Sequence, residues 1–400
     1  MWIIKNANVF DGVDGQLMKN AAIVMEGEKI LDILPECKAM FEDCEVLDAQ
    51  GQYVTPGFID CHLHMLSDEI PDKERQLNDH SAGGVIFDNI DAFIAYRGAD
   101  KARQVLHAGF TTAVDGGGTD FIDVALKDAI KMGYIEGPDY YICGKQITAW
   151  PSHFRGMSVE AHGPWGMRQA VRQMVFWGVD QVKIEMCAPL RTLGRSMGKS
   201  AFTLEEVRAA VDEAHSAHLL VSVHARSPQS IKDSLLGGVD LITHGTGMDD
   251  ECIDLMLKTG AYLLPTLASP PREPSQLLKD NKSRRVVELL AEQGKVHWEG
   301  IRRAYQAGVK MVLSTDAGGV GVLHGEIPQE FLRMKEIGMS NLECLRAGTS
   351  EAARAMRLEG IGRIAKGYRA DLCILEENPL EKLETVLDVK HVVKAGKLVK

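Results

Sequence analysis

The sequence GFIDCHLHM at residues 57–65 decides the fold and carries the first candidate functional residues. It follows an apolar run that begins at Tyr53, a pattern typical of a buried strand. Because alternate residues of a strand point the same way, His62 and His64 should project side by side from its C-terminal end. Two such imidazoles can bind one metal ion, although an isolated pair is more often packed or solvated. The interpretation therefore depends on the rest of the chain.

The central part of the chain alternates apolar runs with amphipathic segments of helix length. Eight runs are expected to be strands, and they start at Tyr53, Thr111, Tyr140, Gln181, Leu219, Leu241, Ala261 and Lys310. The segments expected to be helical are 99–108, 121–132, 164–177, 204–218, 228–237, 249–258 and 283–306. Eight such steps predict an α/β fold of the (β/α)8 TIM-barrel type. A doubly wound open sheet is the alternative, but its site lies at one switch point, whereas polar residues here follow strands throughout the set.

Both ends of the chain differ from the centre in pattern. Residues 1–52 and 367–400 consist of short apolar runs separated by turn sequences, without a long helical pattern. We expect them to pair into one small β-sandwich module, with residues 53–366 forming the barrel.

Composition excludes several classes of function. The 45 basic and 56 acidic residues give a formal net charge of -11, and no basic run suggests a nucleic-acid partner. No segment reaches the roughly 18 uninterrupted apolar residues that a membrane span requires, and the N-terminal residues lack the long apolar region typical of a signal peptide, so we expect a soluble protein. The eight cysteines form no CxxC pair, which favours a reduced, cytoplasmic protein.

Four further polar residues follow the ends of expected strands. They are Lys183 on the fourth, His224 on the fifth, His244 on the sixth and Asp316 on the eighth. Considered one at a time, each residue has an ordinary explanation. The Lys183 side chain could extend so that its ammonium group reaches solvent, and the other three could be cap or turn residues. Jointly, imidazoles and a carboxylate at one barrel mouth suit zinc, with manganese, iron, cobalt or nickel as possible substitutes.

This joint pattern resembles the amidohydrolase superfamily of metal-dependent hydrolases. The resemblance includes the STDAG sequence around Asp316 and the closing segment GRIAKGYRADLCIL at residues 362–375. Within the superfamily, the chain is most similar to the imidazolonepropionase-related branch with prolidase-like and basic-residue-releasing carboxypeptidases. The resemblance implies a barrel enzyme that acts on carbon–nitrogen bonds of a small molecule.

The resemblance also implies a binuclear site for two divalent ions, with zinc as the expected metal. Carbon dioxide would carboxylate Lys183, and the carbamate would bridge both ions. Single-metal deaminases and imidazolone hydrolases of the superfamily generally lack this lysine. Glu185, on the same face of the strand, is an alternative or supporting group. The implied ligands are His62, His64 and Asp316 for one ion and His224 and His244 for the other.

In the implied mechanism, a hydroxide between the ions attacks the scissile carbonyl, and Asp316 is general base and acid. His153 is a candidate contact of the carbonyl oxygen, although it can equally be a loop histidine without a role. His324 is a candidate substrate contact. Positive charge on the catalytic face favours a substrate with a carboxylate, such as a dipeptide or N-acyl amino acid, unless these arginines are only solvated. The candidate arginines are Arg155, Arg191 and Arg226.

Other functions stay open at this point. The chain could be a single-metal deaminase or cyclic-amidine hydrolase, or it could hydrolyse a xenobiotic amide, carbamate or urea. A non-catalytic scaffold is disfavoured because all six implied ligands are present. The long excursions 67–98 and 269–284 are candidate lids or subunit contacts, and we expect a homo-oligomer.

Overall fold

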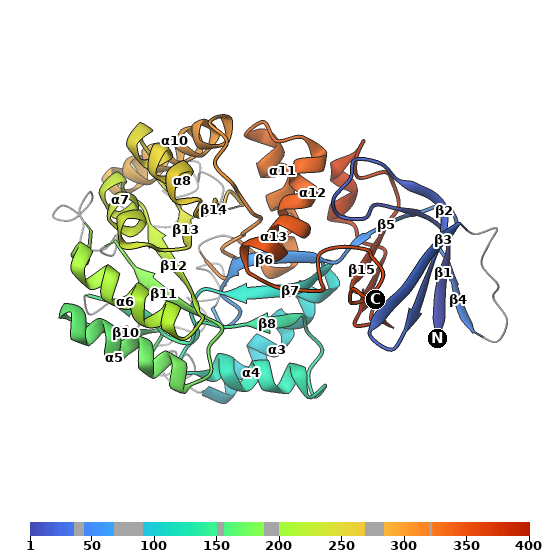
Figure 1. Ribbon diagram of the computed structural model, residues 1–400, viewed down its shortest axis with the longest axis horizontal. Helices are drawn as coiled ribbons and strands as arrows, with labels where there is room; N and C mark the ends of the chain where they lie inside the picture. Colours follow the sequence, from blue (N-terminus) through green and yellow to red (C-terminus); the bar gives the residue numbers. More distant parts are fainter. Residues whose placement is uncertain (36–43, 68–90, 150–155, 188–199, 269–283, 320–321) are drawn as a thin grey trace.

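The computed structural model describes residues 1–35, 44–67, 91–149, 156–187, 200–268, 284–319 and 322–400. The excursions expected at 67–98 and 269–284 therefore lie mostly outside the described residues. Figure 1 shows two parts, a sheet on one side that contains both chain termini and a larger part in which strands alternate with helices.

The first part is an eight-stranded sheet built from both ends of the chain. Its strand order is β17-β16-β15-β5-β1-β2-β3, and β4 pairs with β1. The strands are β1 (Trp2–Val9), β2 (Met18–Glu26), β3 (Lys29–Pro35), β4 (Glu45–Asp48), β5 (Tyr53–Pro56), β15 (Leu372–Leu375), β16 (His391–Lys394) and β17 (Lys397–Leu398). The sandwich form and the domain boundaries stay predictions.

The second part contains two parallel sheets with the orders β6-β7-β8 and β10-β9-β11-β12-β13-β14. All residues of β6, β7 and β11 are buried, as expected for parallel strands covered on both faces. The strands are β6 (Phe58–Leu63), β7 (Phe110–Asp115), β8 (Asp139–Tyr141), β9 (Gln146–Thr148), β10 (Ser158–Glu160), β11 (Gln181–Glu185), β12 (Leu220–Ala225), β13 (Leu241–His244) and β14 (Tyr262–Leu264).

The strand expected from Tyr53 is divided at Gly57. Before the glycine, β5 pairs with β1 and β15, and after it β6 pairs with β7. A Cβ at Gly57 would lie 2.2 Å from the Thr111 hydroxyl oxygen, so a larger residue would force the two strands apart. Gly57 therefore marks the junction of the two parts, shortly after the expected boundary.

Residues 310–318, expected as the eighth strand, contain isolated bridges at Met311 and Ala317 instead of a continuous strand. The Val312 amide donates to the Leu263 carbonyl at 3.1 Å, on the β14 side. The His64 amide donates to the Ala317 carbonyl at 2.7 Å, next to β6. The segment thus hydrogen-bonds to both sheets, and the arrangement is a TIM-barrel-like α/β fold.

The helices lie outside these sheets (Figure 1). Three of the helices in the described ranges begin with a capping box, in which Thr203, Ser227 or Ser340 exchanges hydrogen bonds with the residue three positions later. The α-helices are α3 (Asp91–His107), α4 (Ile122–Lys131), α5 (Gly163–Phe176), α6 (Leu204–Ser216), α7 (Pro228–Gly237), α8 (Asp250–Thr259), α10 (Arg284–Gln306), α11 (Gln329–Glu336), α12 (Asn341–Ala347) and α13 (Ser350–Ala355), with 3-10 turns η3 (His324–Glu326) and η4 (Leu383–Leu387).

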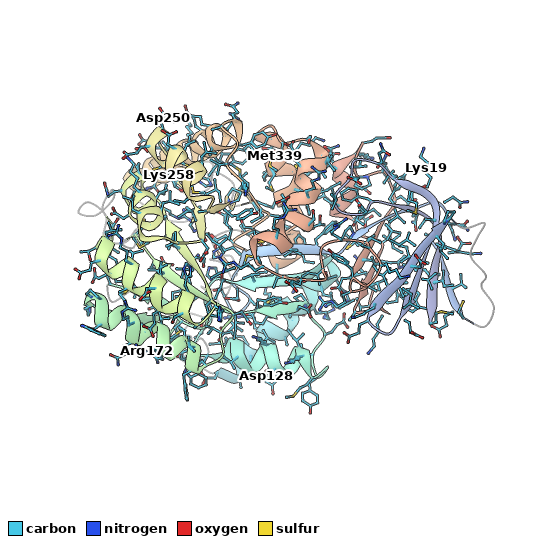
Figure 2. All side chains as sticks on the ribbon, viewed as in Figure 1. Lys19, Asp128, Arg172, Asp250, Lys258 and Met339 are labelled. Carbon is cyan, nitrogen blue, oxygen red and sulfur yellow. The ribbon has the colours of Figure 1, made fainter. Side chains whose placement is uncertain are left out.

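The outer helices place charge in solvent and apolar residues inside. Figure 2 shows Asp128 on α4, Arg172 on α5 and Lys258 on α8, all of which are exposed. Inside, the Phe58 ring packs edge-on against Phe331 on α11, with centroids 4.9 Å apart. Among the described residues, no helix is long and apolar enough to cross a membrane.

An ion cluster joins the terminal sheet to the central part. Arg369, just before β15, pairs with Asp139 at the start of β8 and with Asp371 at 2.5 Å. Lys394 on β16 also reaches Asp139, at 3.0 Å. These contacts link β8 to strands near the C-terminus.

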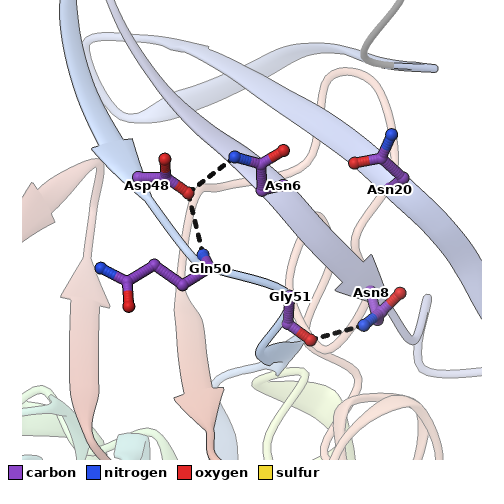
Figure 3. Close-up of a pocket in the computed structure, with 6 residues that line it drawn as sticks. All are labelled: Asn6, Asn8, Asn20, Asp48, Gln50 and Gly51. Carbon is purple, nitrogen blue, oxygen red and sulfur yellow. Dashed lines mark hydrogen bonds between the residues drawn. The ribbon is translucent and has the colours of Figure 1, made fainter.

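A polar pocket of about 330 Å³ lies on the terminal sheet (Figure 3). Asn6 donates to the Asp48 carboxylate at 2.8 Å, and Asn8 donates to the Gly51 carbonyl at 2.6 Å. Asn6 has a φ of 53°, a left-handed value that asparagine tolerates better than most residues. These amides stabilise local turns of the sheet, and none of the metal-ligand candidates lines the pocket.

Candidate metal centre

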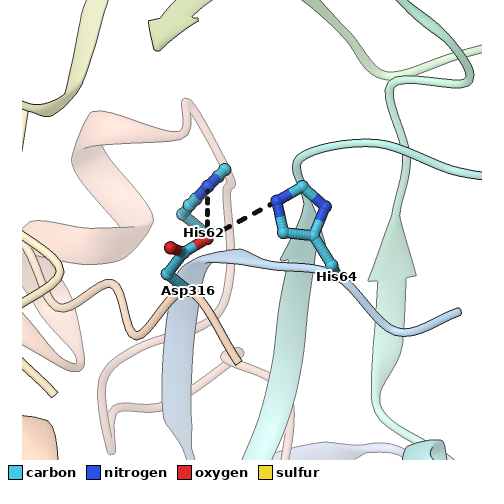
Figure 4. A group of neighbouring side chains, drawn as sticks. All are labelled: His62, His64 and Asp316. Atoms are coloured by element: carbon cyan, nitrogen blue, oxygen red, sulfur yellow. Dashed lines mark ion pairs between the residues drawn. The ribbon is translucent and has the colours of Figure 1, made fainter. Parts of the chain in front are cut away.

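His62, His64 and Asp316 form one compact group (Figure 4). The Asp316 Oδ1 atom lies 3.4 Å from His62 Nε2 and 3.5 Å from His64 Nε2. Two atoms bound to one tetrahedral zinc ion at about 2.0–2.2 Å lie roughly 3.3–3.6 Å apart. The donor set and its spacing therefore fit a metal ion.

Backbone contacts between β6 and residues 310–317 build this group. The Asp316 amide donates to the His62 carbonyl at 2.8 Å. Asp60, two residues before His62, accepts from the His62 amide at 3.0 Å and from the Thr315 hydroxyl at 2.5 Å. Asp316 itself has a φ of 60°, an unusual value that this network of contacts must maintain.

His224 and His244 form a second group on the neighbouring strands β12 and β13. His224 Nδ1 lies 3.0 Å from His244 Nε2. This distance is that of an N–H···N hydrogen bond and is slightly shorter than the separation expected for two ligands of one tetrahedral ion. The rings of His62 and His244 have centroids 6.0 Å apart, so the two groups adjoin.

Lys183 is buried on β11, with 1% of its surface exposed, and its Nζ donates to the Thr243 hydroxyl at 3.0 Å. Burial lowers the pKa of this lysine. A lower pKa increases the neutral amine, which is the form that can react with carbon dioxide. Glu185, on the same strand, is buried, and its Oε2 lies 3.7 Å from His224 Nδ1.

The electrostatics of the site put three of the four histidines in a metal-binding state. The exception is His64, whose pKa burial alone would lower but the hydrogen bond and charge of Asp316 raise above its usual value. Burial lowers the pKa of His62 to about 3 and the pKa values of His224 and His244 well below the usual range, so these imidazoles are neutral. Burial alone would raise the pKa of Asp316, but hydrogen bonds from His62 and His64 lower it well below its usual value. Neutral imidazole and ionised carboxylate are the protonation states that bind metals.

The Amidohydrolase family model matches residues 53–399. The chain belongs to the amidohydrolase family. This amidohydrolase is therefore a hydrolase, and its His–His–Asp group lies at the C-terminal end of β6 and in the adjoining segment that carries Asp316, where it can bind a metal ion.

Relatives cover nearly the whole chain. The ochratoxinase of Aspergillus niger is 26% identical over 97% of this chain and 84% of its own length. The imidazolonepropionase of Streptomyces coelicolor is 25% identical over 90% of this chain and 86% of its own length. A crystal structure of a Xaa-Pro dipeptidase with bound methionine has a TM-score of 0.88 at 29% identity and covers 100% of this chain and 99% of its own.

Of the other predicted site residues of this amidohydrolase, two lie near the ligand groups and three lie outside the described residues. Arg226 lies beside the second group, with Nη2 3.3 Å from His244 Nδ1 and 3.4 Å from His244 Nε2. His324 is fully buried, and its Nε2 lies 3.1 Å from the His64 carbonyl oxygen, which favours support of His64 over substrate contact. His153, Arg155 and Arg191 lie outside the described residues, so their roles stay predictions.

Sequence reasoning missed three residues that support the ligands. Asp60 lies two residues before His62, so strand alternation could have indicated it. Asp115 accepts from the Met65 amide at 2.8 Å and from the Tyr140 hydroxyl at 2.5 Å. Thr266 lies 2.7 Å from His244 Nδ1. No local sequence signal pointed to Asp115 or Thr266, because their contacts join separate strands.

Proposed function

We propose that this amidohydrolase is a binuclear metal-dependent enzyme that cleaves an amide bond of a small carboxylate-bearing substrate, such as a dipeptide or N-acyl amino acid. The observation that carries the proposal is the adjacency of two ligand groups, with His62 and His244 ring centroids 6.0 Å apart. Burial is the main cause of the lowered pKa values of His62 and His224, and the charge of Lys183 lowers both further, in His224 after that of Arg226, so Lys183 lies near both groups.

In this proposal, His62, His64 and Asp316 hold one ion, and His224 and His244 hold the other. Carboxylated Lys183 would offer two anionic oxygens between them, whereas an ammonium group has donors only. Bound divalent ions, expected to be zinc, supply a water of low pKa and Lewis-acid polarisation of the scissile carbonyl.

Asp316 is the proposed general base and acid. Its low pKa keeps the carboxylate ionised before the reaction, so it can accept a proton from the attacking water. It then gives this proton to the leaving amine. Because Asp316 Oδ1 already faces His62 and His64, Oδ2 is the atom that we assign to the proton transfer.

The position of Arg226 supports the proposal that the substrate carries a carboxylate. Its guanidinium lies beside His244 and therefore beside the proposed centre. A guanidinium can make a two-pronged contact with a carboxylate that it cannot make with a neutral amide. The Xaa-Pro dipeptidase among the similar structures is consistent with this class, because a dipeptide has a free carboxylate. Xenobiotic amides, carbamates and ureas are the alternative substrates.

A single-metal deaminase or cyclic-amidine hydrolase is the second candidate. It is favoured by the fact that, in the described part of the chain, His62, His64 and Asp316 alone form a group of three histidine or acidic ligands. Similarity to imidazolonepropionase is consistent with it.

Metal content and turnover together test the proposal. Purified enzyme should contain about two divalent ions per chain by elemental analysis, lose activity on chelation and regain it when metal is added. The same preparation should be screened with dipeptides and N-acyl amino acids, with Asp316→Asn as the inactive reference. Full activity with one ion per chain would instead support the second candidate.

A further inference from the structure

Thr266, just after β14, contacts the ligand His244 from the side opposite the proposed metal position. We propose that Thr266 is a positioning residue, which fixes His244 in the tautomer whose Nε2 can bind the second ion. This inference rests on the proposed binuclear function. The two residues are 2% and 3% exposed, so water does not compete strongly for their contact.

The direction of the hydrogen bond follows from the hydroxyl group. Thr266 Oγ1 lies 2.7 Å from the Pro265 carbonyl oxygen, which can only accept. The single hydroxyl proton is therefore donated to Pro265, and Oγ1 acts as acceptor toward His244. His244 Nδ1, at 2.7 Å, must then carry the ring proton. In neutral imidazole this leaves a lone pair on Nε2, the atom that faces His224 at 3.0 Å.

Arg226 does not provide the same control. Its Nη2 lies almost equally far from both ring nitrogens of His244, at 3.3 and 3.4 Å. It therefore lies against the ring and does not select one nitrogen. The contact with Thr266 is much shorter and involves Nδ1 alone.

The backbone holds Thr266 in an unusual conformation. Its φ is 53°, in the left-handed region that a β-branched residue rarely adopts. The Thr266 amide donates to the Ser314 hydroxyl at 3.3 Å, and the next amide, of Leu267, donates to the Glu330 carboxylate at 2.9 Å. A strained residue that neighbouring contacts maintain near a functional site is consistent with a positioning role.

These contacts also connect the two ligand groups. Ser314 lies two residues before Asp316, a ligand of the first group, whereas His244 belongs to the second. Loss of the Thr266 hydroxyl should therefore affect the second ion most, since the first group keeps its own contacts with Asp60 and the Ala317 backbone.

The test compares Thr266→Val, which keeps the β-branched shape, with Thr266→Ser, which keeps the hydroxyl. Metal-free proteins are titrated with zinc, and with cobalt for its absorption spectrum. We expect Thr266→Val to bind the second ion roughly 10–100-fold more weakly and the first ion unchanged, while Thr266→Ser resembles the native enzyme. Thr259→Val, which removes an exposed hydroxyl on α8, is the matched control.

Nitrogen-15 NMR of the metal-free protein reads the His244 tautomer directly. The native protein and Thr266→Ser should have the proton on Nδ1, and Thr266→Val should show a mixture. The inference would be overturned if His244 had the same tautomer in the native protein, Thr266→Ser and Thr266→Val, or if all three bound the second ion with equal affinity. A native enzyme that binds only one ion while its tautomer still depends on the hydroxyl would instead refute the binuclear function.

Discussion

Asp60 and Thr315, which are 255 positions apart in the chain, share a 2.5 Å hydrogen bond from the Thr315 hydroxyl to the Asp60 carboxylate. Asp60 also accepts from the backbone amides of His62 and Thr315 at 3.0 and 3.1 Å. One buried carboxylate thus holds the strand that carries two histidine ligands against the segment that carries Asp316. The first ligand group depends on this contact for its shape.

Asp60→Asn should weaken metal binding at the first group. The asparagine NH2 cannot accept from the Thr315 hydroxyl, so the hydroxyl proton loses its buried acceptor. We expect roughly 10–100-fold lower affinity for the first ion and a matching loss of activity. Asp128→Asn on the exposed face of α4 is the control. Metal titration with native-like affinity for Asp60→Asn would contradict this role.

Lys183→Ala should remove the proposed bridge between the ions. We expect the second ion to bind roughly 10–100-fold more weakly, with activity falling in parallel. A short carboxylic acid in the medium should partly restore the affinity for the second ion and the activity, because its carboxylate can supply two oxygens in the space that the lysine side chain leaves. The carbamate assignment would fail if the variant kept native activity at native metal content.

Arg226→Met should lower turnover of substrates with a free carboxylate. One charged contact is worth about 1.5–3 kcal/mol, or on the order of ten- to a hundredfold in kcat/KM. For the native enzyme, kcat/KM should be higher by this factor for a free-acid substrate than for its amidated counterpart. For Arg226→Met, the two kcat/KM values should be similar. Arg208→Met, an exposed change on α6, serves as control. Equal turnover of acid and amide by the native enzyme would point to a neutral substrate.

Asp123 on α4 should make stability depend on pH. Burial, and then the charge of Asp115, raises the pKa of Asp123 from 3.8 to about 7 in the folded protein. Between these values the folded state binds more protons than the unfolded state, so this group's contribution to stability declines as pH rises from about 4 through 7. Asp123→Asn should therefore show a smaller drop in Tm between pH 6 and pH 8 than the native protein. An unchanged drop, with Asp128→Asn as reference, would contradict the assignment.

Much of the fold could be predicted because its signals are local. The helices α4, α5, α6, α7 and α8 start and end close to the expected positions, since caps such as Thr203 and Ser227 act within one turn. Strand alternation placed His62 and His64 together, and the family model agrees with the predicted superfamily. The prediction of one continuous strand from Tyr53 was wrong, because the chain is divided at Gly57, which packs closely against Thr111.

The sequence by itself determined the order of the elements, the residue types available as ligands and the family. Only the tertiary structure decided which residues support those ligands. Asp60 meets Thr315, and Thr266 meets His244, through hydrogen bonds between separate segments of the chain, 255 and 22 positions apart. Such contacts have no periodicity or spacing in the sequence, because they depend on how strands are aligned across the whole fold. The same reason explains why Arg226 could be placed beside His244 only in three dimensions.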